Sequence, residues 1–307
     1  MSLRTLGFIE LPANTKAGGF DHAAVHRASA QLYVAHTSND ALDVLDCAKD
    51  VYLHSLPNLT GVAGALVSDE TQQVFTSNRG ENTIGIFAPG HAASLVKVGV
   101  GLKPNGLSFD PQRGLLLAAN VGDAAVPGSH TVSIVDVAQT RMIASVPVAG
   151  RTRWTIFDAA SQTFFVNIAQ PAQIVAIAAS DPTQIARVLD VPAEGPHGLD
   201  IDTATQRLFC ACDGKVLLTL DASTGTVLHT AALSGVPDVI FFNAALQRLY
   251  VAVGDPGVID VFDTTTMTRI EVVPTEQGAH TIAFDADRNK VYAFLPDTHR
   301  AMVFADA

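Results

Sequence analysis

Seven copies of one sequence unit, each about 43 residues long, run along the whole chain. In each copy one residue closes an alternating apolar run, and these residues lie 43, 41, 48, 44, 41 and 42 positions apart. They are His26, Asp69, Asp110, Asp158, Asp202, Asn243 and Asp285. A near-constant period of this length with strand-like composition is typical of the blades of a β-propeller.

Four strand-like runs recur inside each copy. The first alternates apolar and polar residues before the closing position, as at Leu107 and Phe109. A triplet such as LYV or LLL follows, then a run such as VIDVFD and a last run such as RMIASVPV. Period-two alternation between turn residues is the pattern of strands, and a β-sandwich would not explain the constant period. The sequence therefore predicts an all-β fold, a seven-bladed β-propeller with four antiparallel strands per blade, as a single domain over residues 1–307.

The two ends of the chain complete one blade between them. The last copy stops at AMVFADA, a third strand, with no residues left for a fourth. The segment LGFIELPANTKAGG near the start is like a fourth strand with its following loop. We therefore expect a strand at about residues 6–11 to join the last blade, closing the ring and removing the free edges of an open array.

The segments KPNGLSFDPQRGLLLAAN, GPHGLDIDTATQRLFCA and FTSNRGENTIGIF carry a Pro-x-Gly start and a strand–asparagine–strand core. In these features the chain resembles the YVTN-repeat, YncE-like propeller family over essentially its whole length. The first, fourth and sixth copies depart from the Pro-x-Gly start. The resemblance implies a seven-bladed fold that is often exported and whose functions are heterogeneous.

Composition limits the partners of the chain. Its 19 basic and 30 acidic residues give a net charge of −11, and no run of Lys and Arg offsets it, so nucleic acid is an unlikely partner. No apolar stretch reaches the length of a membrane helix, so no membrane insertion is expected. The start MSLRTLGFIELP lacks the apolar core of a signal peptide, although MSL could replace a removed export signal. Both an exported, periplasmic location and a cytoplasmic one therefore stay open.

The three cysteines, Cys47, Cys210 and Cys212, give no paired disulfide framework. Cys210 and Cys212 lie two apart in a strand-like run, on one face, which suits buried thiols.

Seven residues are expected to surround one mouth of the central channel. Antiparallel order places the start of each first strand at the same face as the connection between the second and third strands, and the first strand of a propeller blade is innermost. The residues five positions before the closing ones are Asp21, Gly64, Asn105, Arg153, His197, Asp238 and His280.

Four neighbouring blades thus present a His/Asp cluster. We expect His197, His280, Asp238 and Asp21 to be able to hold one divalent cation, zinc, manganese or calcium. Without a metal, a histidine beside a carboxylate can act as a general base, so the candidate catalytic residues are His197, His280, Asp238 and Arg153. Arg153 would receive a carboxylate or a developing oxyanion. The candidate ligand-binding residues are Asn105, Trp154 and His22.

Two functions remain open from the sequence. One is a small-molecule enzyme, either a lactonase-like hydrolase or a metal-assisted lyase. The other is a non-catalytic scaffold that binds a protein, a peptide or a small ligand on this top face. Polar residues in PHG and PNG turns at a wet mouth can also be merely solvated. No HExxH, GxSxG or phosphate-binding glycine loop is present, so no nucleotide cofactor is expected. The substrate and the oligomeric state are not specified.

Overall fold

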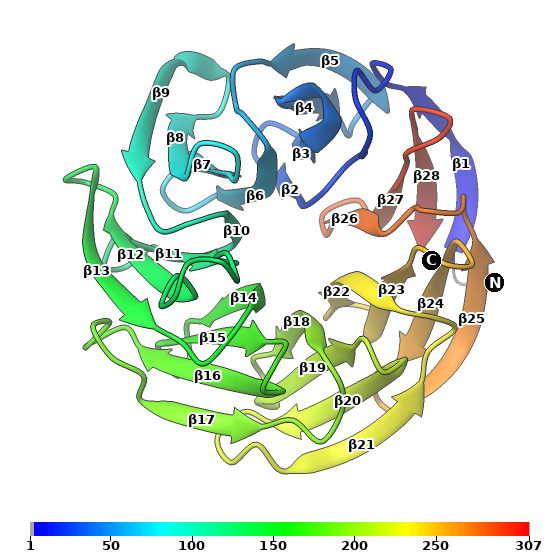
Figure 1. Ribbon diagram of the computed structural model, residues 1–307. Coiled ribbons are helices and arrows are strands. Elements are labelled where there is room, and N and C mark those ends of the chain that lie inside the picture. Colours follow the sequence, from blue (N-terminus) through cyan, green and yellow to red (C-terminus); the bar gives the residue numbers. More distant parts are fainter. Residues whose placement is uncertain (1–2, 307) are drawn as a thin grey trace.

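Seven four-stranded antiparallel sheets form a closed ring in the computed structural model (Figure 1). The structure describes residues 3–306, so Met1 and Ser2 of the possible leader lie outside it, as does Ala307. The prediction of a seven-bladed β-propeller is confirmed. Apart from strands, the described residues form one short 3-10 helix, η1 (Thr37–Asn39). None of the helices in this range is long and apolar enough to cross a bilayer.

The first strand of each blade lies innermost in the ring. These strands are β2 (Ala23–His26), β6 (Val62–Ser68), β10 (Pro104–Asp110), β14 (Thr152–Asp158), β18 (Pro196–Asp202), β22 (Pro237–Asn243) and β26 (Thr281–Asp285).

The second and third strands form the buried middle of each blade, because both faces of the sheet pack against neighbouring blades. Their runs of Val, Leu, Ile and Phe are nearly continuous for this reason; all six residues of Leu115–Asn120 are buried, for example. The second strands are β3 (Gln31–His36), β7 (Gln73–Asn78), β11 (Leu115–Asn120), β15 (Thr163–Ile168), β19 (Arg207–Cys212), β23 (Arg248–Val253) and β27 (Lys290–Leu295). The third strands are β4 (Ala41–Asp46), β8 (Thr83–Ala88), β12 (Thr131–Asp136), β16 (Gln173–Ala178), β20 (Val216–Asp221), β24 (Val258–Asp263) and β28 (Arg300–Asp306).

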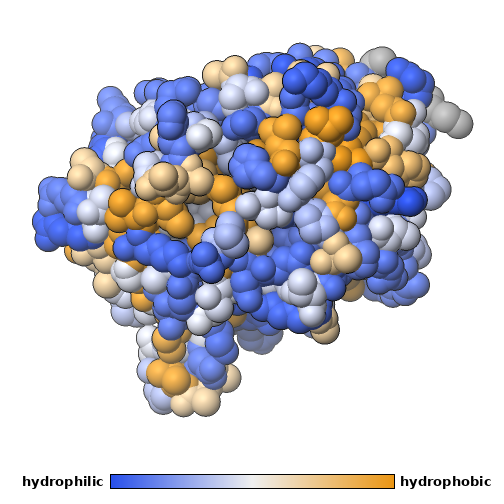
Figure 2. Space-filling model, turned by 90° about the horizontal axis from the view of Figure 1, so that it is seen from above, coloured by the Kyte–Doolittle hydropathy of each residue, from blue (hydrophilic) through white to orange (hydrophobic). Residues whose placement is uncertain are grey.

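The outermost strands form the exposed rim. They are β5 (Val51–Leu56), β9 (His91–Gly99), β13 (Arg141–Pro147), β17 (Arg187–Asp190), β21 (Val227–Ala232), β25 (Thr268–Pro274) and β1 (Leu3–Glu10). Apolar residues such as Phe8 and Val96 remain exposed here. In the view of Figure 2 apolar side chains form separate patches interrupted by hydrophilic ones.

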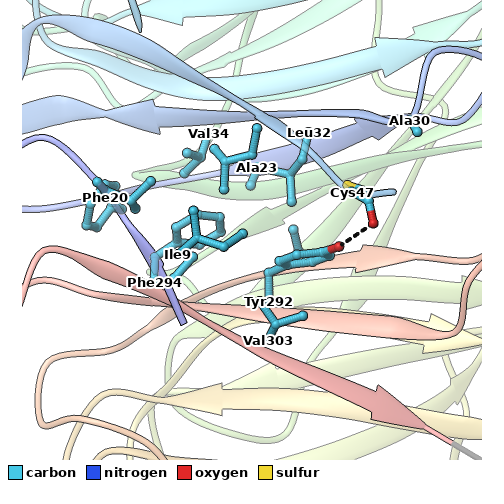
Figure 3. Packing of buried hydrophobic residues seen from close by; sticks show 14 residues of the cluster. Ile9, Phe20, Ala23, Ala30, Leu32, Val34, Cys47, Tyr292, Phe294 and Val303 are labelled. Carbon is cyan, nitrogen blue, oxygen red and sulfur yellow. Dashed lines mark hydrogen bonds between the residues drawn. The ribbon is translucent and has the colours of Figure 1, made fainter. Parts of the chain in front are cut away.

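Strand β1 closes the ring as expected, with bounds shifted slightly towards the start of the chain. It pairs antiparallel with β28 from Leu3↔Asp306 to Glu10↔Arg300. Figure 3 shows the core between the last and first blades, where Phe20 and Phe294 pack together and Tyr292 donates a hydrogen bond to the backbone oxygen of Cys47. All three cysteines are buried free thiols, in agreement with the sequence.

The turns after the first strands share one geometry. The fourth residue after each strand end has a left-handed backbone, with φ between 47° and 66°; these residues are Ala30, Gln72, Gly114, Gln162, Gln206, Gln247 and Asn289. The repeat register holds in six copies and is wrong by one residue in the second, where the strand ends at Ser68 rather than Asp69. The sequence pattern places the closing position of this copy one residue too late, so the equivalent of His197 is Ala63 rather than Gly64. Asp69 instead accepts hydrogen bonds from the backbone N–H and Nε of Arg27.

Candidate functional site

A polar cavity of about 180 Å³ lies at the mouth of the ring where the innermost strands begin. Seven of the eight predicted site residues line it, and two further arginines do so too. The lining residues are Asp21, His22, Arg79, Asn105, Arg151, Arg153, Trp154, His197 and Asp238. The eighth, His280, lies beside the cavity, with its Nε2 4.0 Å from Oδ2 of Asp238. Gly64, by contrast, is not among the lining residues, because β6 ends at Ser68 and the equivalent of His197 is therefore Ala63.

His197 lies between two carboxylates. Its Nδ1 is 2.7 Å from Oδ1 of Asp213, and its Nε2 is 3.2 Å from Oδ1 of Asp238. Burial opposes protonation of the ring, but the charge of Asp238 and the hydrogen bonds to both carboxylates outweigh it and raise the pKa of His197 to about 9. Arg153 lies 3.1 Å from Nε2, and its charge only partly offsets the two carboxylates. His197 is therefore a doubly donating imidazolium at neutral pH.

Asp238 is the carboxylate shared by the histidines of the mouth. Burial alone would raise its pKa, but the charge and hydrogen bond of His197, followed by the charges of His280 and His22, hold the pKa of Asp238 far below its usual range. Asp238 is therefore ionised at any pH near neutrality.

His280 is the most exposed of the three histidines at the mouth. Its Nδ1 donates to the backbone oxygen of Gly278 at 2.7 Å, which fixes the tautomer and leaves a lone pair on Nε2. Its side chain is 41% exposed, so water can reach that nitrogen.

Three arginines converge on the cavity. Arg79 pairs with Asp21 at 3.3 Å, and Arg153 pairs with Asp213 at 3.1 Å. Burial, and then the charges of Arg153 and Arg79, lower the pKa of Arg151, which reflects mutual repulsion within the cluster. With protonated His197 the cluster holds four positive groups against the three carboxylates of Asp21, Asp213 and Asp238.

Three polar atoms of the lining are buried without a hydrogen-bond partner among the described residues. They are Nε of Arg79, Nε of Arg153 and Oδ1 of Asn105. A buried donor or acceptor without a partner is unfavourable by about 1–3 kcal/mol, so such atoms indicate a place that water or a ligand fills.

The rings of His22 and Trp154 lie in tilted contact at the inner end of the cavity. Their ring centroids are 4.0 Å apart at 44°. Burial lowers the pKa of His22, and the nearby Asp21 offsets this only in part, so the ring is neutral at physiological pH. The pair offers an uncharged aromatic wall beneath the charged rim.

Arg79 and Asp213 were missed as site residues from the sequence. Each follows directly after a second strand, Arg79 after β7 and Asp213 after β19, where polar residues resemble ordinary turn caps. The signal that could have found them is the strand order, which places these connections at the same face as the predicted ring.

The cluster fits a metal ion poorly. No group of three or more His, Cys, Asp or Glu side chains within residues 3–306 is arranged to hold one. A histidine ligand must be unprotonated, whereas His197 uses both ring nitrogens as donors to carboxylates. The expectation of a zinc, manganese or calcium site at His197, His280, Asp238 and Asp21 stays a prediction.

Comparisons with known proteins identify the fold. A scan against protein-family models found no match, and neither did a search of curated proteins. Among solved structures, a chain of hydrazine synthase from Kuenenia stuttgartiensis is similar with a TM-score of 0.82 and 10% identity, over 96% of this chain and 98% of that one. Identity this low supports the architecture alone, because one fold carries many functions. By topology and by this likeness, the chain is a seven-bladed β-propeller.

Proposed function

We propose that the mouth cavity binds a small anionic molecule through a carboxylate or comparable oxyanion. The observation that carries the proposal is the convergence of Arg79, Arg151 and Arg153 on one small cavity. Within residues 3–306 the buried Nε–H groups of Arg79 and Arg153 have no hydrogen-bond partner. Together with Arg151 they offer charge-assisted donors in the geometry that oxyanions favour. The volume of about 180 Å³ suits a ligand of a few carbon atoms.

The acceptors of the cavity narrow the ligand further. Oδ1 of Asn105 lacks a partner, and the carboxylate of Asp238 stays ionised. Both accept hydrogen bonds, so a ligand with hydroxyl groups beside its carboxylate satisfies more of the cavity than a simple carboxylate does. A hydroxy acid is therefore the favoured ligand class. A carboxylate side chain of a protein or peptide is the alternative occupant.

In this proposal the protein is a YncE-like binding scaffold that holds the anion without converting it chemically. The arginines then act only as a rigid anion receptor, since their ion pairs to Asp21 and Asp213 hold the guanidinium groups in place.

A second candidate is a lactonase-like hydrolase, which His280 favours. Its exposed Nε2 carries a lone pair that can take a proton from water. The resulting hydroxide would bond to a lactone carbonyl carbon, with the developing oxyanion beside Arg153. The ring C–O bond then breaks, the leaving oxygen takes the proton back from His280, and a hydroxy acid results. That product belongs to the class of ligand proposed for the cavity. The metal-assisted lyase is the third version, and no step is assigned to a metal here.

Binding of lactate, with glycerol as the neutral control, tests the receptor. Calorimetry should detect lactate and not glycerol. Arg153→Gln should weaken lactate binding about tenfold or more, since hydrogen bonds to charged groups contribute about 1.5–3 kcal/mol. Arg141→Gln on the exposed strand β13 is the matched control and should change affinity less than about twofold. Equal affinity for lactate and glycerol, or no effect of Arg153→Gln, would contradict the proposal.

Hydrolysis of δ-gluconolactone separates the enzyme from the scaffold. If His280 is the base, His280→Gln should lower kcat by about 10²–10⁴-fold while lactate binding persists. If the protein does not accelerate hydrolysis above the spontaneous rate, the non-catalytic scaffold is favoured.

A further inference from the structure

A second, larger cavity lies inside the ring on the other side of the His22–Trp154 pair. Its volume is about 500 Å³, and both of these residues line it as well as the mouth cavity. From there it extends to the opposite mouth, where Asp69, Glu70 and Pro111 border it. We call this space the lower chamber.

The walls of the lower chamber are mostly apolar. One equivalent position in six of the innermost strands contributes to these walls. In each blade it is the residue that pairs with the third residue of the second strand. The residues at this position are Ala24, Leu66, Ser108, Ile156, Asp200 and Phe241. The hydroxyls of Ser108 and Thr155 satisfy each other at 2.9 Å, so they offer little to a ligand. Arg27 lies at the outer border and pairs with Asp69.

Asp200 is the polar feature of these walls. Its Oδ1 accepts the N–H of Ile201 at 2.8 Å, and its Oδ2 accepts the N–H of Phe242 in the next blade at 2.6 Å. Each oxygen keeps a further lone pair, and the carboxyl borders the cavity. Burial, opposed by these two hydrogen bonds, raises the pKa of Asp200 to about 6. The surroundings of the carboxyl are therefore those of a low-dielectric pocket.

We propose that the lower chamber is a second binding site, for an uncharged and mostly apolar small molecule with a hydroxyl group that donates to Asp200. Burial of an apolar ligand against these side chains is favourable by about 25 cal/mol per Å². An anion is disfavoured by Asp200 and by the carboxylates of Asp69 and Glu70 at the opening. A cation would have to lose its hydration inside apolar walls. This site is separate from the anion receptor at the mouth, with which it shares the His22–Trp154 pair.

Trp154 makes the proposal measurable, because it is the one tryptophan of the sequence and it borders the chamber. The probe is 1-octanol, which does not absorb where tryptophan is excited; octanoate and octylamine are its charged counterparts. We expect a saturable change of Trp154 emission with 1-octanol, and binding at least tenfold weaker for octanoate and octylamine.

Two variants locate the site. Ala24→Phe should fill the chamber and weaken 1-octanol binding at least tenfold, and Phe241 at the equivalent position indicates that a phenylalanine side chain fits the strand geometry. Asp200→Leu, which copies Leu66, should remove the preference for 1-octanol over 1-chlorooctane, which lacks the hydroxyl. Arg141→Gln on the exposed strand β13 is the control and should leave 1-octanol binding within twofold.

Several results would overturn the proposal. They are a non-saturable response to 1-octanol, an unchanged affinity in Ala24→Phe, or tighter binding of either charged counterpart. Because Asp200→Leu also removes two backbone hydrogen bonds, Ala24→Phe serves as the independent variant if Asp200→Leu does not fold. Unchanged lactate binding in Ala24→Phe would show that the mouth receptor is intact.

Discussion

Nδ1 of His197 donates a hydrogen bond of 2.7 Å to Oδ1 of Asp213. Asp213 comes from the connection after β19, while His197 lies at the start of β18, so the bond ties two adjacent strands of one blade at the mouth. Asp238 of the next blade contacts Nε2, so carboxylates hold the imidazole ring of His197 from both sides. A histidine that looks like a base in the sequence thus lies between two carboxylates that favour its protonated form.

The first prediction concerns stability against pH. The pKa of His197 is raised to about 9 from its ordinary value of 6.5, so the folded state binds the proton more tightly than the unfolded state does. The stabilisation is complete below pH 6.5 and is lost as the pH rises through 9. At about 1.4 kcal/mol per pKa unit, it is on the order of 3–4 kcal/mol. Thermal unfolding of the wild type between pH 6 and 10 should show this loss.

The variant His197→Gln should lack that part of the pH dependence, whereas His229→Gln, at an exposed position of β21, should keep it. Identical pH profiles for wild type and His197→Gln would contradict a charged His197.

The second prediction separates the two carboxylates. Among the effects that raise the pKa of His197, the charge of Asp238 is the largest. We therefore expect Asp238→Asn to lower the His197 pKa by about one unit or more. Titration of the imidazole by NMR measures this directly. Asp213→Asn is the matched comparison, and a larger fall in that variant would reverse the assignment.

The third prediction concerns His22. Burial lowers its pKa below 6.5, so the unfolded state takes up the proton first and the stability contributed by neutral His22 is lost as the pH falls below 6.5. Because the ring of His22 contacts that of Trp154, we expect its protonation to quench Trp154 emission only at a pH below 6.5. A quenching midpoint at or above 6.5, absent in His22→Asn, would show a pKa that is not lowered.

The fourth prediction tests ring closure. Phe294 is 1% exposed in the core between the last and first blades and packs on Phe20. Phe294→Ala should lower the free energy of unfolding by about 3–5 kcal/mol. Phe8→Ala, at a site 51% exposed beside Arg300, should lower it by less than about 1 kcal/mol. Denaturant unfolding measures both, and similar losses would argue against this core as the closure.

The sequence predicted the fold and most of the mouth for the same physical reason. A period-two pattern repeated seven times fixes the strand order, and strand order fixes which residues share a face. His197, Asp238 and Arg153 could therefore be placed together from counting alone. Counting is wrong by one residue in the second copy, because Ser68 and Asp69 are both polar and the apolar pattern does not reveal which of them ends β6.

Charge state and cavities could not be predicted in this way. The doubly donating state of His197 depends on Asp213, whose position after a strand looks like that of any turn cap. Asp200 alternates with Leu199 and Ile201 like a solvent-facing residue, yet it borders the lower chamber. A residue that faces the lower chamber and a residue that faces bulk water alternate with apolar neighbours in the same way. The sequence pattern therefore does not distinguish the two environments.

The last prediction concerns the metal expected from the sequence. Metal binding requires unprotonated histidine, and protonation of His197 between Asp213 and Asp238 opposes it. Elemental analysis of protein purified without an affinity metal should therefore find far less than about one zinc, manganese or calcium per chain. About one ion per chain, lost in both His197→Ala and His280→Ala, would instead support the metal version. It would also mean that the ion displaces the proton of His197, so the stability difference between pH 6.5 and 9 would then depend on the metal.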